Sequence, residues 1–168
     1  MITVSGCSAS SGASAVPEST DTAIQSGPPL DVSGQAACTL LSVEFLEGVS
    51  VDPTTAIDDS NENASSCVWR SQDGADNLAI AISQNYSLER ITAALEETPG
   101  SERMTVKGYQ AAREGPPDSL ICTIYTAVSE RHLFSVEFGS RAARPETPCT
   151  TTERVASAVI DALAARSR

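Results

Sequence analysis

Alternating apolar and polar positions predict much of the regular structure in this chain. The clearest pattern runs over 133–138, where the Phe and Val residues point to one face and the Ser and Glu residues point to the other. A second extended run covers 120–128, and residues 129–132 fit a connecting turn. The two runs therefore predict a β-hairpin.

Other parts of the chain predict shorter strands and a loop. Alternation favours three more strands, over 67–70, 78–83 and 105–113. Gly108 weakens the last of them, and Asp73-Gly74 predicts a turn between the first two. The segment 52–63 is acidic and contains Pro53, so we expect it to be a loop.

Apolar residues spaced three or four apart predict three helices. Ser42 caps the first, which ends at Gly48, and Ser87 caps the second. In the last helix Thr150 and Glu153 form a capping box. Its expected buried face consists of Val155, Val159, Ile160 and Leu163. Strands outnumber helices and hairpin links dominate, so the pattern predicts an α+β fold in which helices cover an antiparallel β-sheet.

The N-terminal part of the chain has the composition of a linker. Between Ser8 and Gly34, 19 of 27 residues are Ser, Ala, Gly, Pro or Thr, and none is aromatic, Lys or Arg. Such a segment cannot bury enough apolar surface to offset the entropy of ordering it. We therefore expect a disordered linker over 8–35 and one folded domain over 36–168.

The chain is acidic, with 22 Asp and Glu residues against 11 Lys and Arg residues and a net charge of −11. A negative potential repels phosphate backbones and anionic headgroups. We therefore expect no nucleic-acid binding and no electrostatic docking to a membrane. No apolar run approaches the length of about 18 residues that would span a bilayer.

The segment Val4-Ser5-Gly6-Cys7 matches a bacterial lipoprotein processing site, in which an aliphatic residue and two small residues precede the cysteine. The Cys7 thiol would carry a lipid such as palmitate and anchor the chain to the outer face of the cell membrane. An export signal also needs a basic region and about 7–15 apolar residues, so 1–7 would be the remnant of a longer signal. The alternative is a chance match in an ordinary tail with a free thiol.

The remaining four cysteines, Cys38, Cys67, Cys122 and Cys149, form no CxxC pair and so lack the spacing of a zinc or thioredoxin motif. Four cysteines permit three pairings. We favour Cys38–Cys67 and Cys122–Cys149, because each bond would join the start of a helix to a strand. Two disulfides indicate an oxidising compartment. The alternative is four buried free thiols in the cytosol.

The order of these cysteine motifs resembles an actinobacterial family of cell-envelope lipoproteins of unknown function. The resemblance rests on Cys38-Thr39-Leu40-Leu41, Cys67-Val68-Trp69-Arg70, Cys122 and the helix start at Cys149. It implies lipid anchoring at Cys7, export and both disulfides. It also implies a sheet-plus-helices fold similar to the PsbP/Mog-like sandwich of photosystem accessory and Ran-binding proteins. The family brings no established reaction, so the resemblance supplies no catalytic residues.

Candidate chemical groups are few. His132 is the sole histidine and lies in the predicted hairpin turn, where a solvated side chain is the simplest interpretation. The oxygen-rich segment 58–63 lacks the central glycine and the ligand spacing of a calcium loop. Trp69 offers a stacking surface, but it shares a strand face with Cys67 and is expected in the core. We therefore expect no catalytic residues, no metal site and no cofactor.

The sequence thus favours a non-catalytic, lipid-anchored lipoprotein of the cell envelope that binds a protein partner or a small ligand. One alternative is a carrier that holds a hydrophobic ligand between helix and sheet, which a well-formed apolar cavity would support. Another is an envelope enzyme of unknown reaction, which would need a cleft that gathers acids or hydroxyls with shifted pKa values.

Overall fold

The computed structural model describes residues 27–167, so Cys7 and residues 8–26 of the predicted linker lie outside the described residues. In chain order the elements are η1 (Ala37–Thr39), α1 (Val43–Gly48), β1 (Asp52–Asp58), β2 (Ala64–Arg70), β3 (Asp76–Gln84), α2 (Leu88–Leu95), β4 (Glu102–Val106), β5 (Tyr109–Glu114), β6 (Ile121–Ala127), β7 (His132–Ser140) and α3 (Pro148–Arg166). No described helix combines the length and the apolar character needed to cross a membrane.

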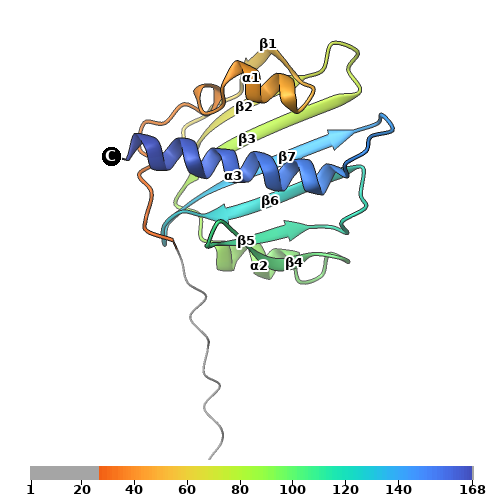
Figure 1. Cartoon of the computed structure of the whole chain (residues 1–168). Helices are drawn as coiled ribbons and strands as arrows, with labels where there is room; N and C mark the ends of the chain where they lie inside the picture. The colour runs from red at the N-terminus through yellow and green to blue at the C-terminus, as the bar shows by residue number, and fades with distance from the viewer. Residues whose placement is uncertain (1–26, 168) are drawn as a thin grey trace, which may run out of the picture.

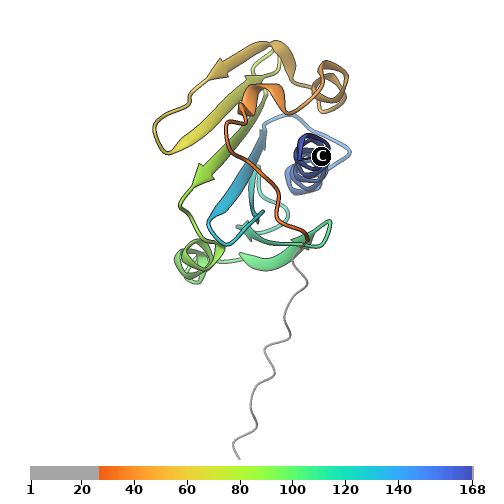
Figure 2. The same cartoon turned by 90° about the vertical axis from the view of Figure 1, so that its left-hand side faces the viewer.

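The strands form one seven-stranded sheet in the order β1-β2-β3-β7-β6-β5-β4, and every neighbouring pair is antiparallel. The helix α3 lies over one face of this sheet (Figure 1). In the view turned by 90°, α1 and α3 lie on the same side of the sheet and α2 lies on the other (Figure 2). The fold is therefore α+β with an antiparallel sheet and helices on its faces, as the sequence predicts.

The strand register defines the buried face of the sheet. Ile80 of β3, Val136 of β7 and Ile124 of β6 are aligned across the sheet and are fully buried. Trp69 of β2 is only 1% exposed, which confirms its predicted place in the core. Because side chains alternate along a strand, the neighbours of these residues point to the opposite face, where α2 covers only part of the sheet.

The apolar side of α3 completes this core. Val155, Val159 and Leu163 are fully buried and Ile160 nearly so, which confirms the predicted buried face of the last helix. These side chains belong to one continuous hydrophobic cluster with the facing strand residues. The interface between α3 and the sheet is thus filled with side chains, and it gives no support to the alternative of a hydrophobic-ligand carrier.

Two disulfides connect helical segments to strands. Cys38 of η1 is bonded to Cys67 of β2, and Cys122 of β6 is bonded to Cys149 in the first turn of α3, with a Cα–Cα distance of 5.0 Å in both. Both predicted pairings are confirmed. In the chain-entropy model each bond stabilises the fold by about 3–4 kcal/mol, because it closes a loop of nearly thirty residues in the unfolded chain.

The predicted loop over 52–63 is wrong for its first half, which forms the edge strand β1. This strand pairs with β2, and the register shifts between Asp52 and Ile57. Pro53 is compatible with the strand because an edge strand does not need every N–H for pairing. The acidic side chains are compatible for a similar reason, since most of β1 is exposed.

The strand predicted over 105–113 is in fact two strands. The strand β4 pairs with β5, and a tight turn at Lys107 and Gly108 joins them. Both turn residues have positive φ angles, 50° and 83°. Positive φ at both central residues is the geometry of a two-residue hairpin turn, and glycine adopts it without strain. The glycine that weakens the predicted strand therefore marks the turn of a hairpin.

The predicted cap of the last helix is also wrong. α3 begins at Pro148, and the Thr147 hydroxyl accepts a hydrogen bond from the Thr150 backbone N–H at 3.2 Å. Proline is favoured at the first helical position because it has no N–H to leave unpaired. Thr150 and Glu153 thus lie inside the helix rather than forming a capping box.

Residues 27–36 pack against the domain, and we call them the N-terminal strap. Leu30 and Val32 are 6% and 2% exposed, and the Leu30 N–H donates to the Val128 carbonyl at 3.0 Å. The Tyr109 hydroxyl donates to the Pro28 carbonyl at 2.8 Å. The predicted linker boundary at residue 35 is therefore wrong, and the folded unit includes the strap.

We expect Leu30→Ala to destabilise the domain by about 2–4 kcal/mol, because it removes most of a buried apolar side chain and leaves a cavity. Urea unfolding followed by Trp69 fluorescence would measure the loss. Ser33→Ala is the matched control, since Ser33 is exposed on the same strap and its change should stay within about 0.5 kcal/mol. Equal stabilities of the two variants would mean that the strap does not pack in solution.

Candidate functional site

A large hollow opens where the α1–β1 loop, the β2–β3 turn and the β7–α3 connection meet. It encloses ≈ 730 Å³. Its charged side chains are Glu47, Asp52, Asp73, Asp76 and Arg144. We call it the distal cleft. Four carboxylates against one guanidinium make it strongly negative, and the net charge of the whole chain adds to that potential.

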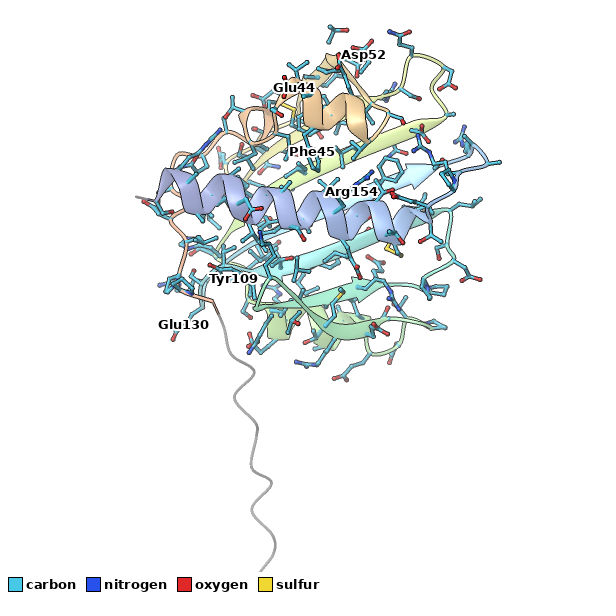
Figure 3. All side chains as sticks on the ribbon, in the orientation of Figure 1. Glu44, Phe45, Asp52, Tyr109, Glu130 and Arg154 are labelled. Atoms are coloured by element: carbon cyan, nitrogen blue, oxygen red, sulfur yellow. A yellow bond between two sulfur atoms is a disulfide. The ribbon has the colours of Figure 1, made fainter. Side chains whose placement is uncertain are left out.

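The distal cleft and the N-terminal strap lie at opposite ends of α3. Arg144 precedes the first turn of the helix, whereas the strap passes its last turn, where the Asp31 N–H donates to the Ser167 hydroxyl at 3.2 Å. A helix of 19 residues is roughly 28 Å long at 1.5 Å per residue. In Figure 3 Asp52 of the cleft lies above α3 and Tyr109, which contacts the strap, lies below it.

Local hydrogen bonds hold Asp52 at the start of β1. Its Oδ1 accepts from the Thr54 hydroxyl at 2.7 Å and from the Thr54 N–H at 2.8 Å, and its Oδ2 accepts from Gln72 Nε2 at 3.2 Å. These donors favour the charged carboxylate and hold the pKa of Asp52 below its usual value, with the Thr54 side chain the largest cause. Asp52 therefore keeps its charge at neutral pH.

The β2–β3 turn positions Asp73 in the same way. Its Oδ1 accepts from the Ser71 hydroxyl at 2.6 Å and from the Ala75 N–H at 2.9 Å, around a Gly74 with a φ of 69°. The Ser71 hydroxyl, then the Ala75 N–H and the charge of Arg144 lower the pKa of Asp73. The turn thus presents a second ionised carboxylate to the cleft.

A buried ion pair forms the floor of the cleft. Asp76 is 5% exposed and the Arg144 side chain is 17% exposed. Arg144 binds both carboxylate oxygens of Asp76, with Nε 3.1 Å from Oδ1, and its guanidinium lies 5.4 Å from the centre of the Phe138 ring. The pair fixes the β7–α3 connection against the start of β3. Burial of either charge without the other would be costly.

The other candidate groups from the sequence do not gather at the cleft. His132 begins β7, and its Nδ1 lies 3.0 Å from the Ser129 hydroxyl in the same hairpin turn. In the segment 58–63, Asp58 and Asn61 accept hydrogen bonds from backbone N–H groups of their own loop. No cluster of three or more potential metal-binding acids, histidines or cysteines occurs within residues 27–167.

The cleft acids were missed in the sequence because they come from separate segments. Asp52, Asp73 and Arg144 lie in three different connections, and their approach depends on the strand order β1-β2-β3-β7. The sequence predicts the Asp73-Gly74 turn, but no local pattern indicates that this turn faces the α1–β1 loop. A pairing of Asp76 with a residue 68 positions away is a tertiary contact without a local pattern.

The fold and the site define a disulfide-bonded α+β domain with a negative cleft at one end. Residues 2–162 match DUF3558, described as a protein of unknown function, and the chain belongs to that family. No curated protein matches the chain. No solved structure matches it either, so the expected similarity to the PsbP/Mog-like sandwich stays a prediction.

We expect Arg144→Ala to destabilise the domain by about 3–5 kcal/mol, because it leaves the buried Asp76 carboxylate without a partner. Adding Asp76→Asn should recover part of this loss, since it removes the uncompensated charge. Thermal and urea unfolding of the two single variants and the double variant would measure the coupling.

The exposed pair Arg154–Glu146 provides the control for this cycle, because both side chains are nearly half exposed. Arg154→Ala should cost about 1 kcal/mol or less. A loss for Arg144→Ala as small as that for Arg154→Ala would contradict the structural role given to the buried pair.

Proposed function

We propose that this chain is a non-catalytic, lipid-anchored lipoprotein of the cell envelope, whose domain binds a positively charged group of a protein partner or small ligand in the distal cleft. The cleft itself carries the proposal, because it is a hollow of ≈ 730 Å³ that presents carboxylates which stay ionised. Hollows with a few converging polar groups are the usual places for ligands.

The anchoring part of the proposal rests on the cysteines. Cys7 follows the small residues of a processing site, and the other four cysteines form two disulfides. Structural disulfides are typical of proteins outside the cytoplasm. If the nineteen residues between Cys7 and Gly27 behaved as a random coil, they would span roughly 22–26 Å. That length would hold the domain at the outer face of the cell membrane and leave the cleft, at the far end of α3, accessible.

The charge of the cleft supports a cationic ligand. Asp52 and Asp73 make hydrogen bonds but no ion pair among the described residues, so their charges are available to a ligand. A net charge of −11 would also steer basic partners toward the domain.

The arrangement of hydroxyl and imidazole groups supports a non-catalytic role. Ser129 and His132 are in contact, but the same serine hydroxyl also accepts from the Arg131 N–H, as expected for a turn. A hydrolytic pair needs a third group that orients the imidazole. Hydrogen bonds from Ser33 and, to a smaller extent, the charge of the nearby His132 lower the pKa of Asp31, but Asp31 makes no hydrogen bond to His132 within residues 27–167.

Intact mass of the protein isolated from the membranes of its natural host tests the anchor. We expect a chain that begins at Cys7, carries acyl groups there, and has both disulfides oxidised. Cys7→Ser in the same host is the control and should release the protein from the membrane fraction. Native protein with an unmodified Cys7 and four free thiols would refute the anchoring proposal.

Binding at the cleft can be tested with tetralysine as the probe and the full chain carrying Cys7→Ser. Amide resonances of 50–53, 71–76 and 142–145 should shift saturably in the NMR spectrum. The double variant Asp52→Asn/Asp73→Asn should weaken binding about three- to tenfold, since each exposed charge pair contributes up to about 1 kcal/mol.

Glu96→Gln/Glu97→Gln is the matched control for this titration, because it removes two exposed carboxylates at the end of α2. It should change the affinity for tetralysine less than twofold. Equal weakening by the two double variants would indicate binding to the general negative charge rather than to the cleft.

A further inference from the structure

We propose that a second hollow, on the opposite face of the β2–β3 turn, binds a carboxylate that carries an apolar substituent. This hollow of ≈ 400 Å³ is lined by Arg70, Asn77, Arg141 and the turn residues 74–76. We call it the arginine hollow. It differs from the distal cleft in face and in charge, and the proposal does not rest on the proposed function.

One row of aligned residues crosses four strands beside this hollow. Arg70 of β2 is aligned with Asn77 of β3, Asn77 with Gly139 of β7, and Gly139 with Ile121 of β6. Aligned residues of antiparallel strands share a face of the sheet. This is the face opposite to α3, since the neighbouring residues of each strand form the core. Arg141 follows β7, and its N–H donates to the Ala75 carbonyl at 2.9 Å.

Arg70 and Arg141 have no ion-pair or hydrogen-bond partner for their side chains within residues 27–167. Both side chains are exposed. Three other arginines pair with carboxylates: Arg113 with Glu102, Arg144 with Asp76 and Arg154 with Glu146.

Two carboxylates lie close to Arg70 in the fold, and neither makes an ion pair with it within residues 27–167. Asp52 is aligned with Arg70 across β1 and β2, but its oxygens accept from Thr54 and Gln72 on the side of the distal cleft. Asp76 lines the arginine hollow, but its carboxylate binds Arg144. The two guanidinium groups of the hollow therefore remain available to an external anion.

The row also supplies a neutral donor and an apolar contact. A Cβ on Gly139 would lie 2.5 Å from the Asn77 Oδ1, so only glycine leaves room for the Asn77 carboxamide at this place. Ile121 is 56% exposed at the end of the row. Guanidinium groups bind carboxylates through charge-assisted hydrogen bonds, and an exposed isoleucine gains from apolar cover.

Glu137 restricts where the anion can lie. It occupies the same face one row further from the turn, aligned with Ala79 and Thr123. Its charge disfavours a carboxylate over the middle of the sheet. The anionic group is therefore held at the turn, between Arg70 and Arg141, and its apolar substituent extends along the row toward Ile121.

The test titrates the full chain carrying Cys7→Ser with acetate, butanoate, hexanoate and inorganic phosphate. Amide resonances of 74–77 and 139–141 should shift saturably with hexanoate. Each buried CH₂ strengthens binding by up to about fourfold. With partial burial over Ile121, hexanoate should bind about tenfold more tightly than acetate, and more tightly than phosphate.

Exposed arginines can be replaced without loss of the fold, so variants of the hollow are informative. Arg70→Gln and Arg141→Gln should each weaken hexanoate binding about tenfold, because each removes a charge-assisted hydrogen bond. Gly139→Ala keeps both charges but displaces Asn77, and it should also weaken binding. Arg131→Gln is the matched control, since Arg131 is exposed in the β6–β7 turn, and it should change the affinity less than twofold.

Three results would overturn the proposal. The first is a shift that does not saturate with any of the four anions. The second is saturable hexanoate binding that Arg70→Gln and Arg141→Gln leave unchanged. The third is phosphate binding tighter than hexanoate binding, which would remove the apolar half of the assignment.

Discussion

The packing of a single helix, α3, against a sheet that is wider than the helix is the constraint on which the rest of the structure depends. Seven strands at about 4.8 Å spacing span roughly 29 Å, whereas a helix covers about 10 Å. α3 therefore covers β6 and β7, and α1, η1 and the strap must cover the remainder of the same face. On the other face α2 covers only β5 and β6, so the ends of β2, β3 and β7 stay open. Both hollows form at the end of the sheet where β2 and β7 finish and β3 begins.

The disulfides stabilise this incomplete covering. Cys38–Cys67 holds η1 against β2, and Cys122–Cys149 holds the first turn of α3 against β6. The second bond also restricts the path of the β7–α3 connection. This connection starts at the end of β7 and ends at α3, and the disulfide fixes the first turn of α3 to β6, the strand beside β7. Arg144 lies in that short connection and is thereby kept near Asp76. The Cys122–Cys149 disulfide thus supports the Asp76–Arg144 ion pair that forms the floor of the distal cleft.

The accuracy of the sequence predictions follows from how local each signal is. The β6–β7 hairpin, the cap of α2 at Ser87 and the buried face of α3 depend on residues close in sequence, and the structure confirms them. β1 and the strap form because of partners elsewhere in the chain. Leu30 is one apolar residue in a Ser, Pro and Gly background, and only its contacts with the sheet explain its burial. The two hollows are invisible in the sequence for the same reason, since each combines residues from connections that are far apart.

The strap determines at which end of the domain any preceding residues are attached. Its hydrogen bonds to Gly108, Val128 and Ser167 hold Asp31 beside the last turn of α3 and Gly27 beside the β4–β5 turn. Any attachment upstream of Gly27 therefore pulls on the end of the domain away from the two hollows, whatever the length or composition of the residues before it. The distal cleft and the arginine hollow share Asp76 and the β2–β3 turn, so they lie at the same end of the domain on opposite faces of that turn. A partner that approaches this end meets a negative and a positive site.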